Sequence, residues 1–151
     1  MARRRFFVPE IRNGAAELIG GEAEHLVRVL RAEVGQVYEI SDNRQVYLAE
    51  VAVARKALVS FTVLEKLPEP EESVEIVLAA ALIKFDKFEW LVEKATELGV
   101  AAIQPFEAVR SERGLGHAAV KRFARWEKIA LEASQQSRRV RLPELRPVQR
   151  F

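Results

Sequence analysis

An apolar stretch, a helical pattern and a second apolar stretch follow one another closely in the second half of the chain. The residues from Val74 to Ile83 are almost entirely apolar, which is typical of a strand buried on both faces. Apolar residues from Phe88 to Ala95 then recur at helical spacing, and a short run, Val100 to Ile103, predicts a second strand closed by Pro105. Such tight strand–helix–strand spacing predicts a parallel βαβ unit with a right-handed crossover. In open parallel sheets, ligands bind just past the carboxyl ends of the strands.

The ends of the helices carry their own signals. Asp86 is the expected N-cap of the first helix, with Glu89 three residues later in capping-box position. Gly99 lies where the chain must turn left-handed after that helix. A second long helix is predicted over Ala118 to Gln136. Its apolar stripe consists of Phe123, Trp126, Ala130 and Ala133.

The pattern before residue 70 is different. A polar, proline-containing connector, Leu67 to Glu72, separates the two parts of the chain, so we expect domains at residues 1–70 and 71–151. Glu22 to Arg31 has the pattern of one short helix. Period-two alternation predicts strands over Arg5–Val8, Gln36–Ile40, Val46–Ala54 and Leu58–Leu64. Several short strands at this spacing predict a small barrel or sandwich.

Composition excludes several classes of site. The chain has no Cys, so it has no disulfide framework, no thiolate nucleophile and no cysteine metal site. With only His25 and His117, a histidine-based zinc site is not expected, and we predict no metal. No apolar run approaches the roughly 20 residues of a membrane span, and no secretory signal is recognisable. We therefore expect a cytoplasmic protein without a membrane partner.

Positive charge is concentrated at the carboxyl-terminal end. The formal net charge is only +2, but basic residues outnumber acidic ones three to one from residue 121 onward. Clustered arginines suit phosphate and therefore nucleic acid. A solvated charged tail explains the same composition, and charge alone does not separate the two interpretations.

Candidate anion-binding residues in the first part lie at its beginning and on its helix. Arg4 and Arg5 precede or begin a strand and could contact phosphates, although a basic N-terminus also solvates a frayed end. His25, Arg28 and Arg31 share the short helix or its edge. His25 could stack on a base, or it could be a partly buried structural histidine.

In the second part, candidates fall at the predicted carboxyl ends of the strands. Lys84 and Lys87 follow the first strand, and Lys84 could bind an anion or pair with Asp86. Arg110 and Arg113, followed by glycine, form a plausible phosphate clamp after the second strand.

The helices of the second part contribute further charged residues. Arg125 lies on a basic face of the second helix, and Arg138 and Arg139 end that helix, where they could also serve the helix dipole. Glu93 and Glu97 could do acid–base work or bind a metal, but an ion-pair face with the nearby lysines is the more ordinary interpretation. None of the common nucleotide-binding or hydrolase motifs is present, and the sequence identifies no catalytic residue.

An ordered set of short motifs resembles the amino-terminal portion of the RsmE family, the 16S ribosomal RNA uridine-N3 methyltransferases. The motifs are individually weak, but they run in order over almost the whole chain. They are Arg4–Phe7, His25–Arg31 with Gly35, Lys84 and Lys87, Lys94–Val100, Ile103–Pro105, Ser111–Arg113, Arg125–Trp126, Lys128–Ala130, Glu132–Ala133, Gln135–Ser137, Arg139 and Pro143.

The resemblance implies an α+β two-domain protein: a PUA-like β-barrel that binds RNA, then the first part of an α/β SPOUT methyltransferase domain, which is a knotted, Rossmann-like fold. It also implies S-adenosylmethionine as cofactor, 16S rRNA of the small ribosomal subunit as substrate, and a homodimer. The expected RNA-binding residues are Arg4, Arg5, His25, Arg28, Arg31, Lys84, Lys87, Arg110, Arg113, Arg125, Arg138 and Arg139. The family's glycine-rich GPEGG-type stretch, which helps to form the knot and the cofactor pocket, is missing from residues 1–151. We therefore expect this chain to bind RNA but to lack the methyl-donor site.

Two functional hypotheses follow. The first is an RNA uridine methyltransferase of which this chain is the substrate-binding part. The second is a non-catalytic RNA- or ribosome-binding module whose α/β half serves dimerisation or scaffolding. A continuation of the chain bearing the GPEGG-type stretch would favour the first hypothesis, and a natural stop after Phe151 would favour the second.

Overall fold

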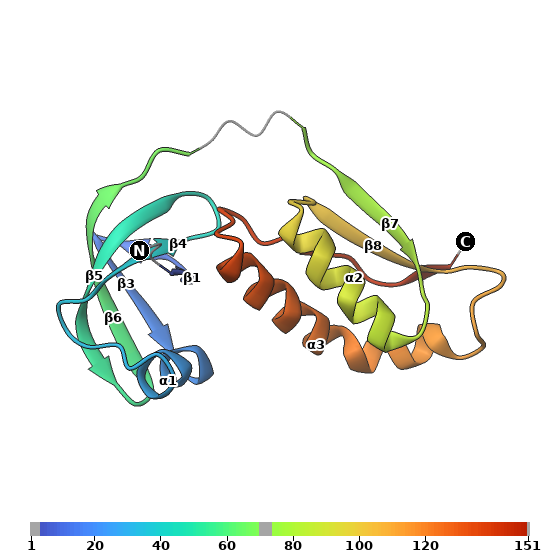
Figure 1. Cartoon of the computed structure of the whole chain (residues 1–151), viewed down its shortest axis with the longest axis horizontal. Helices are drawn as coiled ribbons and strands as arrows, with labels where there is room; N and C mark the ends of the chain where they lie inside the picture. Colours follow the sequence, from blue (N-terminus) through green and yellow to red (C-terminus); the bar gives the residue numbers. More distant parts are fainter. Residues whose placement is uncertain (1–3, 70–73, 151) are drawn as a thin grey trace. The chain divides into compact units, whose positions relative to one another are not determined.

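The computed structural model describes residues 4–69 and 74–150, and the chain divides into two compact units (Figure 1). Unit 1 comprises residues 1–70 and unit 2 comprises residues 71–151. Half of the predicted connector, residues 70–72, lies outside the described residues.

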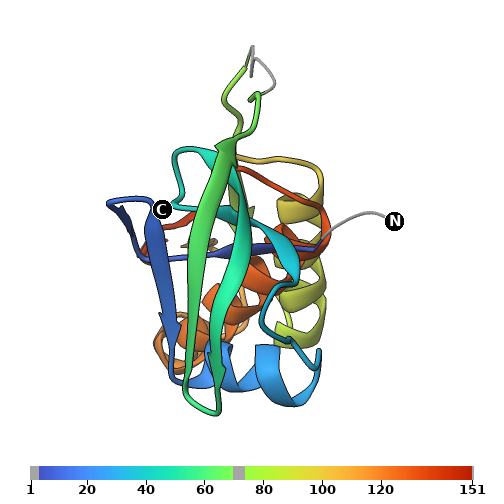
Figure 2. The ribbon, with the colours of Figure 1, turned by 90° about the vertical axis from the view of Figure 1, so that its left-hand side faces the viewer.

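Unit 1 is a six-stranded sheet with one helix. Along the sheet the strands follow the order β1-β4-β5-β6-β3-β2; β1 and β4 pair in parallel, and every other pair is antiparallel. The sheet is strongly curled, and the helix lies at one end of it (Figure 2). The elements are β1 (Arg5–Phe7), β2 (Ile11–Arg12), β3 (Ala15–Ile19), α1 (Gly21–Arg28), β4 (Val37–Ser41), β5 (Val46–Arg55) and β6 (Leu58–Lys66).

The core of unit 1 fills the concave side of this curled sheet. Leu26 of α1 is fully buried and belongs to one cluster with Ile40, Val51, Val59 and Phe61 of the central strands. Each of these side chains contributes on the order of 1.5–3 kcal/mol through removal from water. The apolar residues that alternate along β4, β5 and β6 therefore place one face of the sheet against α1.

The four predicted strands of unit 1 are present, with ends that differ by one to two residues. The predicted helix is shorter than expected, because α1 ends at Arg28 and Arg31 lies beyond it with a positive φ of 53°. The sequence interpretation missed the hairpin of β2 and β3. Its turn is Asn13-Gly14, with φ angles of 49° and 73°, and Asn-Gly is the preferred sequence of such two-residue turns.

Unit 2 is a parallel sheet with two helices. The strand order is β10-β8-β7, with β9 also beside β8, and all of these pairs are parallel, as the spacing predicted for the first two strands. The elements are β7 (Val77–Ala81), α2 (Phe85–Glu97), β8 (Ala102–Glu107), α3 (Leu115–Gln136), β9 (Glu144–Leu145) and β10 (Gln149–Arg150). The fold of the chain is therefore mixed α/β. No helix among residues 4–69 and 74–150 is long and apolar enough to cross a membrane.

The core of unit 2 is centred on Trp126. This side chain is fully buried and packs on Phe88 with ring centroids 4.6 Å apart and edge-on to Phe85 at 5.9 Å. Ala130 and Ala133 on the same face of α3 are also buried, so the predicted apolar stripe of this helix is confirmed.

The predicted start of α2 is wrong. Its N-cap is Lys84, without a side-chain cap, and Asp86 lies within the first turn. Glu89 contacts Arg122 and Arg125 of α3 at 3.5 and 2.9 Å. The predicted end is right: Gly99 has a φ of 92°.

Two expectations about the strands of unit 2 are also corrected. The run from Val74 to Ile83 is not buried on both faces, because β7 is an edge strand and Val74, Ile76 and Val77 are exposed. The second strand does not close at Pro105 but continues through it to Glu107. Pro105 falls between the segments of β8 that pair with β9 and β10, so its missing N–H interrupts neither short ladder.

Candidate nucleic-acid interface

Arg5 forms a buried ion pair within unit 1. It lies on β1 opposite Glu39 of β4, and its Nε and Nη2 donate hydrogen bonds to Glu39 Oε2 at 3.0 and 2.8 Å. Both side chains are buried, with 10% and 7% of their surfaces exposed. Arg5 therefore joins the two parallel strands, and its guanidinium is directed at a protein carboxylate.

Arg4 precedes this pair and is exposed. Because β1 and β4 are parallel, Arg4 lies at the end where β4 begins, and its carbonyl accepts a hydrogen bond from Glu39 N. Tyr38 at this end donates its hydroxyl to Gln36 Oε1 at 2.8 Å. Burial raises the pKa of Tyr38, and the positive charge of Arg4 partly opposes that rise. This end of the sheet therefore carries Arg4, whose side chain forms no hydrogen bond or ion pair with any residue that the structure describes.

The residues predicted to bind RNA on or near α1 differ in whether they pair with other side chains. Arg28 donates from Nη1 to Glu24 Oε1 at 2.7 Å, an exposed pair one helical turn apart. His25 and Arg31 are exposed, and neither side chain has a hydrogen bond or ion pair with any residue that the structure describes. The segment from Arg31 to Gln36 connects α1 to the start of β4 (Figure 2).

In unit 2, a serine joins the carboxyl ends of two neighbouring strands. Ser111 donates its hydroxyl to the carbonyl of Leu82, just past β7, at 3.1 Å. The same hydroxyl accepts the N–H of Ala108, just past β8, at 3.0 Å. This arrangement fixes the loop that carries Arg110 beside the segment that carries Lys84, so the two predicted basic positions lie at one edge of the sheet.

This edge carries several basic side chains. Lys84, Lys87, Arg110 and Arg113 are exposed and form no ion pair with the part of the chain that the structure describes. The edge also holds one carboxylate, Glu107, which is 3.5 Å from Arg150 of β10. That carboxylate lies against the first turn of α3, where a Cβ on Gly116 would come within 2.8 Å of it. Glycine at 116 thus leaves room for a negative charge at the positive end of the helix dipole.

The remaining predicted arginines serve the packing of unit 2. Arg125 pairs through Nε with Glu89 Oε1 at 2.9 Å, which links α3 to α2. Arg139 donates from Nη1 to the carbonyl of Thr96 at 3.1 Å, near the end of α2. Arg138 is exposed, has a φ of 56° and makes interactions within the protein. These side chains are at least partly used by the fold.

Glu93 and Glu97 form an ion-pair face. Lys94 donates to Glu93 Oε1 at 2.9 Å and to both carboxylate oxygens of Glu97 at 3.0 and 3.1 Å. The hydrogen bond that Lys94 donates to Glu93, followed by those it donates to Glu97, raises the pKa of Lys94. Residues 4–69 and 74–150 contain no cluster of acidic and histidine side chains that could hold a metal ion.

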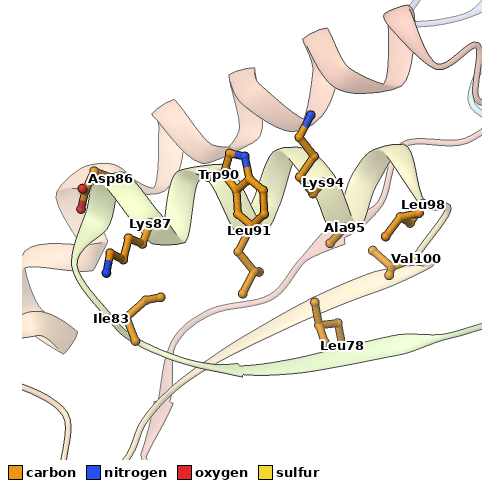
Figure 3. A pocket seen from close by; sticks show the side chains of 10 residues that line it. All are labelled: Leu78, Ile83, Asp86, Lys87, Trp90, Leu91, Lys94, Ala95, Leu98 and Val100. Carbon is orange, nitrogen blue, oxygen red and sulfur yellow. The ribbon is translucent and has the colours of Figure 1, made fainter.

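An apolar groove of about 730 Å³ lies between α2 and the edge strand β7 (Figure 3). The side chains of Trp90 and Leu98 are exposed at the groove, and Leu91 points from the helix towards the strands. Lys87, Lys94 and Asp86 are its charged members. The full lining is Leu78, Ile83, Asp86, Lys87, Trp90, Leu91, Lys94, Ala95, Leu98 and Val100. The sequence interpretation did not foresee this groove, because it assigned the apolar residues of β7 to a fully covered strand.

The predicted residues thus fall into two groups: those that are bound to other groups of the protein, and those that are exposed without an ion pair among the described residues. The structure brings Lys84 and Arg110 to one edge of unit 2. Sequence reasoning did not foresee the bridging role of Ser111, although the residue follows directly after Arg110. A short polar residue between a strand end and a helix start is the available signal for such a turn.

Comparison with known proteins gives consistent matches. Residues 70–151 match the model of the RNA methyltransferase domain family. The chain is 37% identical over 137 residues to ribosomal RNA small subunit methyltransferase E of Bacillus subtilis (strain 168), a match that covers 89% of this chain and 54% of that protein. The enzyme of the same name from Synechocystis is 33% identical over 149 residues, covering 95% of this chain and 46% of the relative. The chain therefore spans about half the length of these relatives.

Two solved structures have the same fold. One is ribosomal RNA small subunit methyltransferase E from Neisseria gonorrhoeae bound to S-adenosyl methionine, with a TM-score of 0.86, 29% identity, and coverage of 98% of this chain and 63% of that chain. The other is a putative methyltransferase from Legionella pneumophila in complex with the same cofactor, with a TM-score of 0.86, 28% identity, and coverage of 100% and 64%.

Proposed function

From the premise that this chain belongs to the RNA methyltransferase family, we propose that it is the RNA-binding portion of a methyltransferase that acts on 16S ribosomal RNA of the small subunit. The observation that carries the proposal is the edge of unit 2, where Ser111 holds two strand ends together and where Lys84, Lys87, Arg110 and Arg113 form no ion pair with any of the described residues. Unpaired cations on fixed loops are what phosphate contacts require.

The proposed reaction is methyl transfer from S-adenosylmethionine to N3 of a uridine. The support for this specificity is the resemblance of the ordered motifs to the uridine-N3 enzymes, together with relatives that are named as small-subunit ribosomal RNA methyltransferases. We further propose that unit 1 is a PUA-like RNA-binding domain, that unit 2 is the first part of a SPOUT domain, and that the whole protein acts as a homodimer.

The groove of unit 2 does not fit the methyl donor. S-adenosylmethionine presents ribose hydroxyls, an ammonium group and a sulfonium, all of which need acceptors or negative charge. The groove is almost entirely apolar, and Asp86 is its one carboxylate among the described lining residues. We therefore derive no step of methyl transfer from residues 4–69 and 74–150, and assign the donor site to the part of the relatives' length that this chain does not span.

RNA titration tests the assigned interface. Replacing Lys84 and Arg110 together by alanine should weaken binding to a 16S rRNA fragment and lower the salt slope by about two units, because each lost phosphate contact contributes about one. The charge-matched control replaces Lys121 and Lys128, two exposed lysines of α3. Equal effects of both double substitutions would reduce the interface to a nonspecific charge effect and contradict the assignment.

Calorimetric titration tests the donor assignment. We expect no measurable S-adenosylmethionine binding by the 151-residue chain. Micromolar binding, which corresponds to about −8 kcal/mol, would contradict our placement of the donor site. RNA binding combined with a natural full-length protein that never transfers a methyl group would instead support the non-catalytic binding module.

A further inference from the structure

Arg31 has a backbone conformation that arginine rarely adopts. Its φ is 53°, in the left-handed region where a Cβ is disfavoured. Asn13 and Asn43 share this region, but asparagine tolerates it because its short side chain can bond to the nearby backbone. Arginine has no such local compensation.

The end of α2 shows which residue suits such a position. There the chain turns at Gly99, with the N–H of Gly99 bonded to Thr96 O at 3.0 Å and that of Val100 bonded to Ala95 O at 3.2 Å. After α1, the N–H of Ala32 likewise donates a hydrogen bond back to a carbonyl of the helix, Leu26 O, at 3.1 Å. Glycine is the usual residue at a left-handed helix end, yet the turn after α1 has Arg31.

The Arg31 guanidinium contributes no hydrogen bond or ion pair to the part of the fold that the structure describes. The side chain is exposed and has no hydrogen bond or ion pair with any residue that the structure describes. Arg138, which has a similar φ after α3, does make interactions within the protein and so has a structural reason to be there. A strained residue without a partner in the fold points to a ligand outside it.

The surroundings of Arg31 indicate what that ligand offers. Val29 and Val34 flank it in the chain and are 63% and 65% exposed. Arg28, the nearest cation in sequence, is already paired with Glu24. A guanidinium can bind a phosphate with its edge or stack on a base with its flat face, and exposed apolar residues close to it in the chain favour the flat face of an unstacked base.

We propose that Arg31, with Val29 and Val34, stacks on an unpaired base of single-stranded RNA and so positions a base rather than a phosphate. The inference rests on the proposed function, because it requires that the chain binds RNA. It adds that unit 1 recognises RNA in a single-stranded region.

Two substitutions separate a base contact from a phosphate contact. Arg31→Lys keeps the positive charge and loses the planar group, and Arg31→Gly removes both while relieving the backbone. The probe is a short RNA hairpin with unpaired uridines in its loop, compared with a fully paired duplex of the same length. For a base contact, both variants bind the hairpin at least about fivefold more weakly, and the lysine variant keeps the wild-type salt slope. Duplex binding by the lysine variant does not change.

A phosphate contact gives a different result. In that case Arg31→Lys binds the hairpin like the wild type and Arg31→Gly lowers the salt slope by about one unit, which would overturn the inference while leaving the proposed function intact. Failure of the wild-type chain to bind either RNA would overturn the proposed function itself.

Thermal unfolding provides the control for a structural role. Arg31→Gly should not lower the unfolding midpoint, because glycine suits the left-handed conformation. Asn43→Gly relieves the same conformation in another turn and should leave RNA affinity unchanged. A destabilised Arg31→Gly variant would show that the side chain serves the fold and would contradict the inference.

Discussion

Replacing Arg5 by methionine removes one member of the buried pair that joins β1 to β4. The guanidinium makes two hydrogen bonds to Glu39, at 2.8 and 3.0 Å, and the carboxylate that remains is only 7% exposed. Water cannot replace the two lost hydrogen bonds without entering the sheet, so the variant must leave a buried carboxylate less well compensated or open the edge strand.

The expected cost follows from this burial. Removing one member of a buried ion pair typically costs about 3–5 kcal/mol. We expect the lower end, about 3 kcal/mol, because β1 is an edge strand whose side chains water can partly reach. Domains of this size lose roughly 1 kcal/mol of stability per molar urea, so the unfolding midpoint of unit 1 should fall by about 3 M.

Aromatic residues allow the two units to be followed separately. Tyr38 and Tyr47 lie in unit 1, whereas Trp90 and Trp126 lie in unit 2. Fluorine NMR of fluorotyrosine-labelled protein reports the urea transition of unit 1, and tryptophan fluorescence reports that of unit 2. The tyrosine signals should move to lower urea in the Arg5→Met variant.

Two controls make the result decisive. Arg4→Met removes an exposed charge next to Arg5. It should change the free energy of unfolding by no more than about 0.5 kcal/mol. The double variant Arg5→Met, Glu39→Leu removes both charges and should recover most of the loss. If the single variant keeps the wild-type midpoint, or if the double variant is no more stable than the single one, the pair does not stabilise the sheet as argued.

Three further changes test other parts of the structure. Ser111→Ala should weaken RNA binding although it removes no charge, because Arg110 loses its fixed position; an unchanged affinity in the same titration would contradict this. The pKa of Tyr38 is raised above 10.0, so its contribution to stability is present below pH 10 and is lost as the pH rises through the folded pKa. Arg4→Ala should raise this pKa further, and ultraviolet titration showing no change would refute the attribution. Amides of β7 should exchange with solvent faster than those of β5, because β7 is an edge strand. Trp90→Ser should reduce binding of an apolar fluorescent dye to the groove beside β7. Slow exchange in β7, or unchanged dye binding, would count against an open edge.

The sequence predicted the elements that depend on local periodicity. The parallel pairing of β7 and β8 and the left-handed turn at Gly99 follow from spacing and residue type, and both are confirmed. The N-cap at Asp86 is wrong because a capping signal is weak compared with a tertiary contact: Glu89, its expected partner, pairs with two arginines that come more than 30 residues later.

Burial was harder to predict because it depends on what covers a strand. The apolar run of β7 reads as a central strand, yet β7 lies at an edge and residues such as Val77 are exposed. Similarly, composition counts every arginine as an available cation. Only the structure shows that Arg5, Arg125 and Arg139 are engaged within the protein, whereas Lys84 and Arg110 form no ion pair with residues 4–69 or 74–150.

The strand order of unit 1 has a consequence for the time course of its folding. β4, β5 and β6 are consecutive and antiparallel, so they pair through short loops, whereas β1 pairs with β4 across 34 residues and β3 reaches over to β6. Distant pairings form slowly because a long loop must close first. A chain emerging from the ribosome therefore exposes β1 before its partner strand exists. In pulse-labelled refolding, amides of β5 and β6 should become protected before those of β1, and simultaneous protection would show that the loop closes without delay.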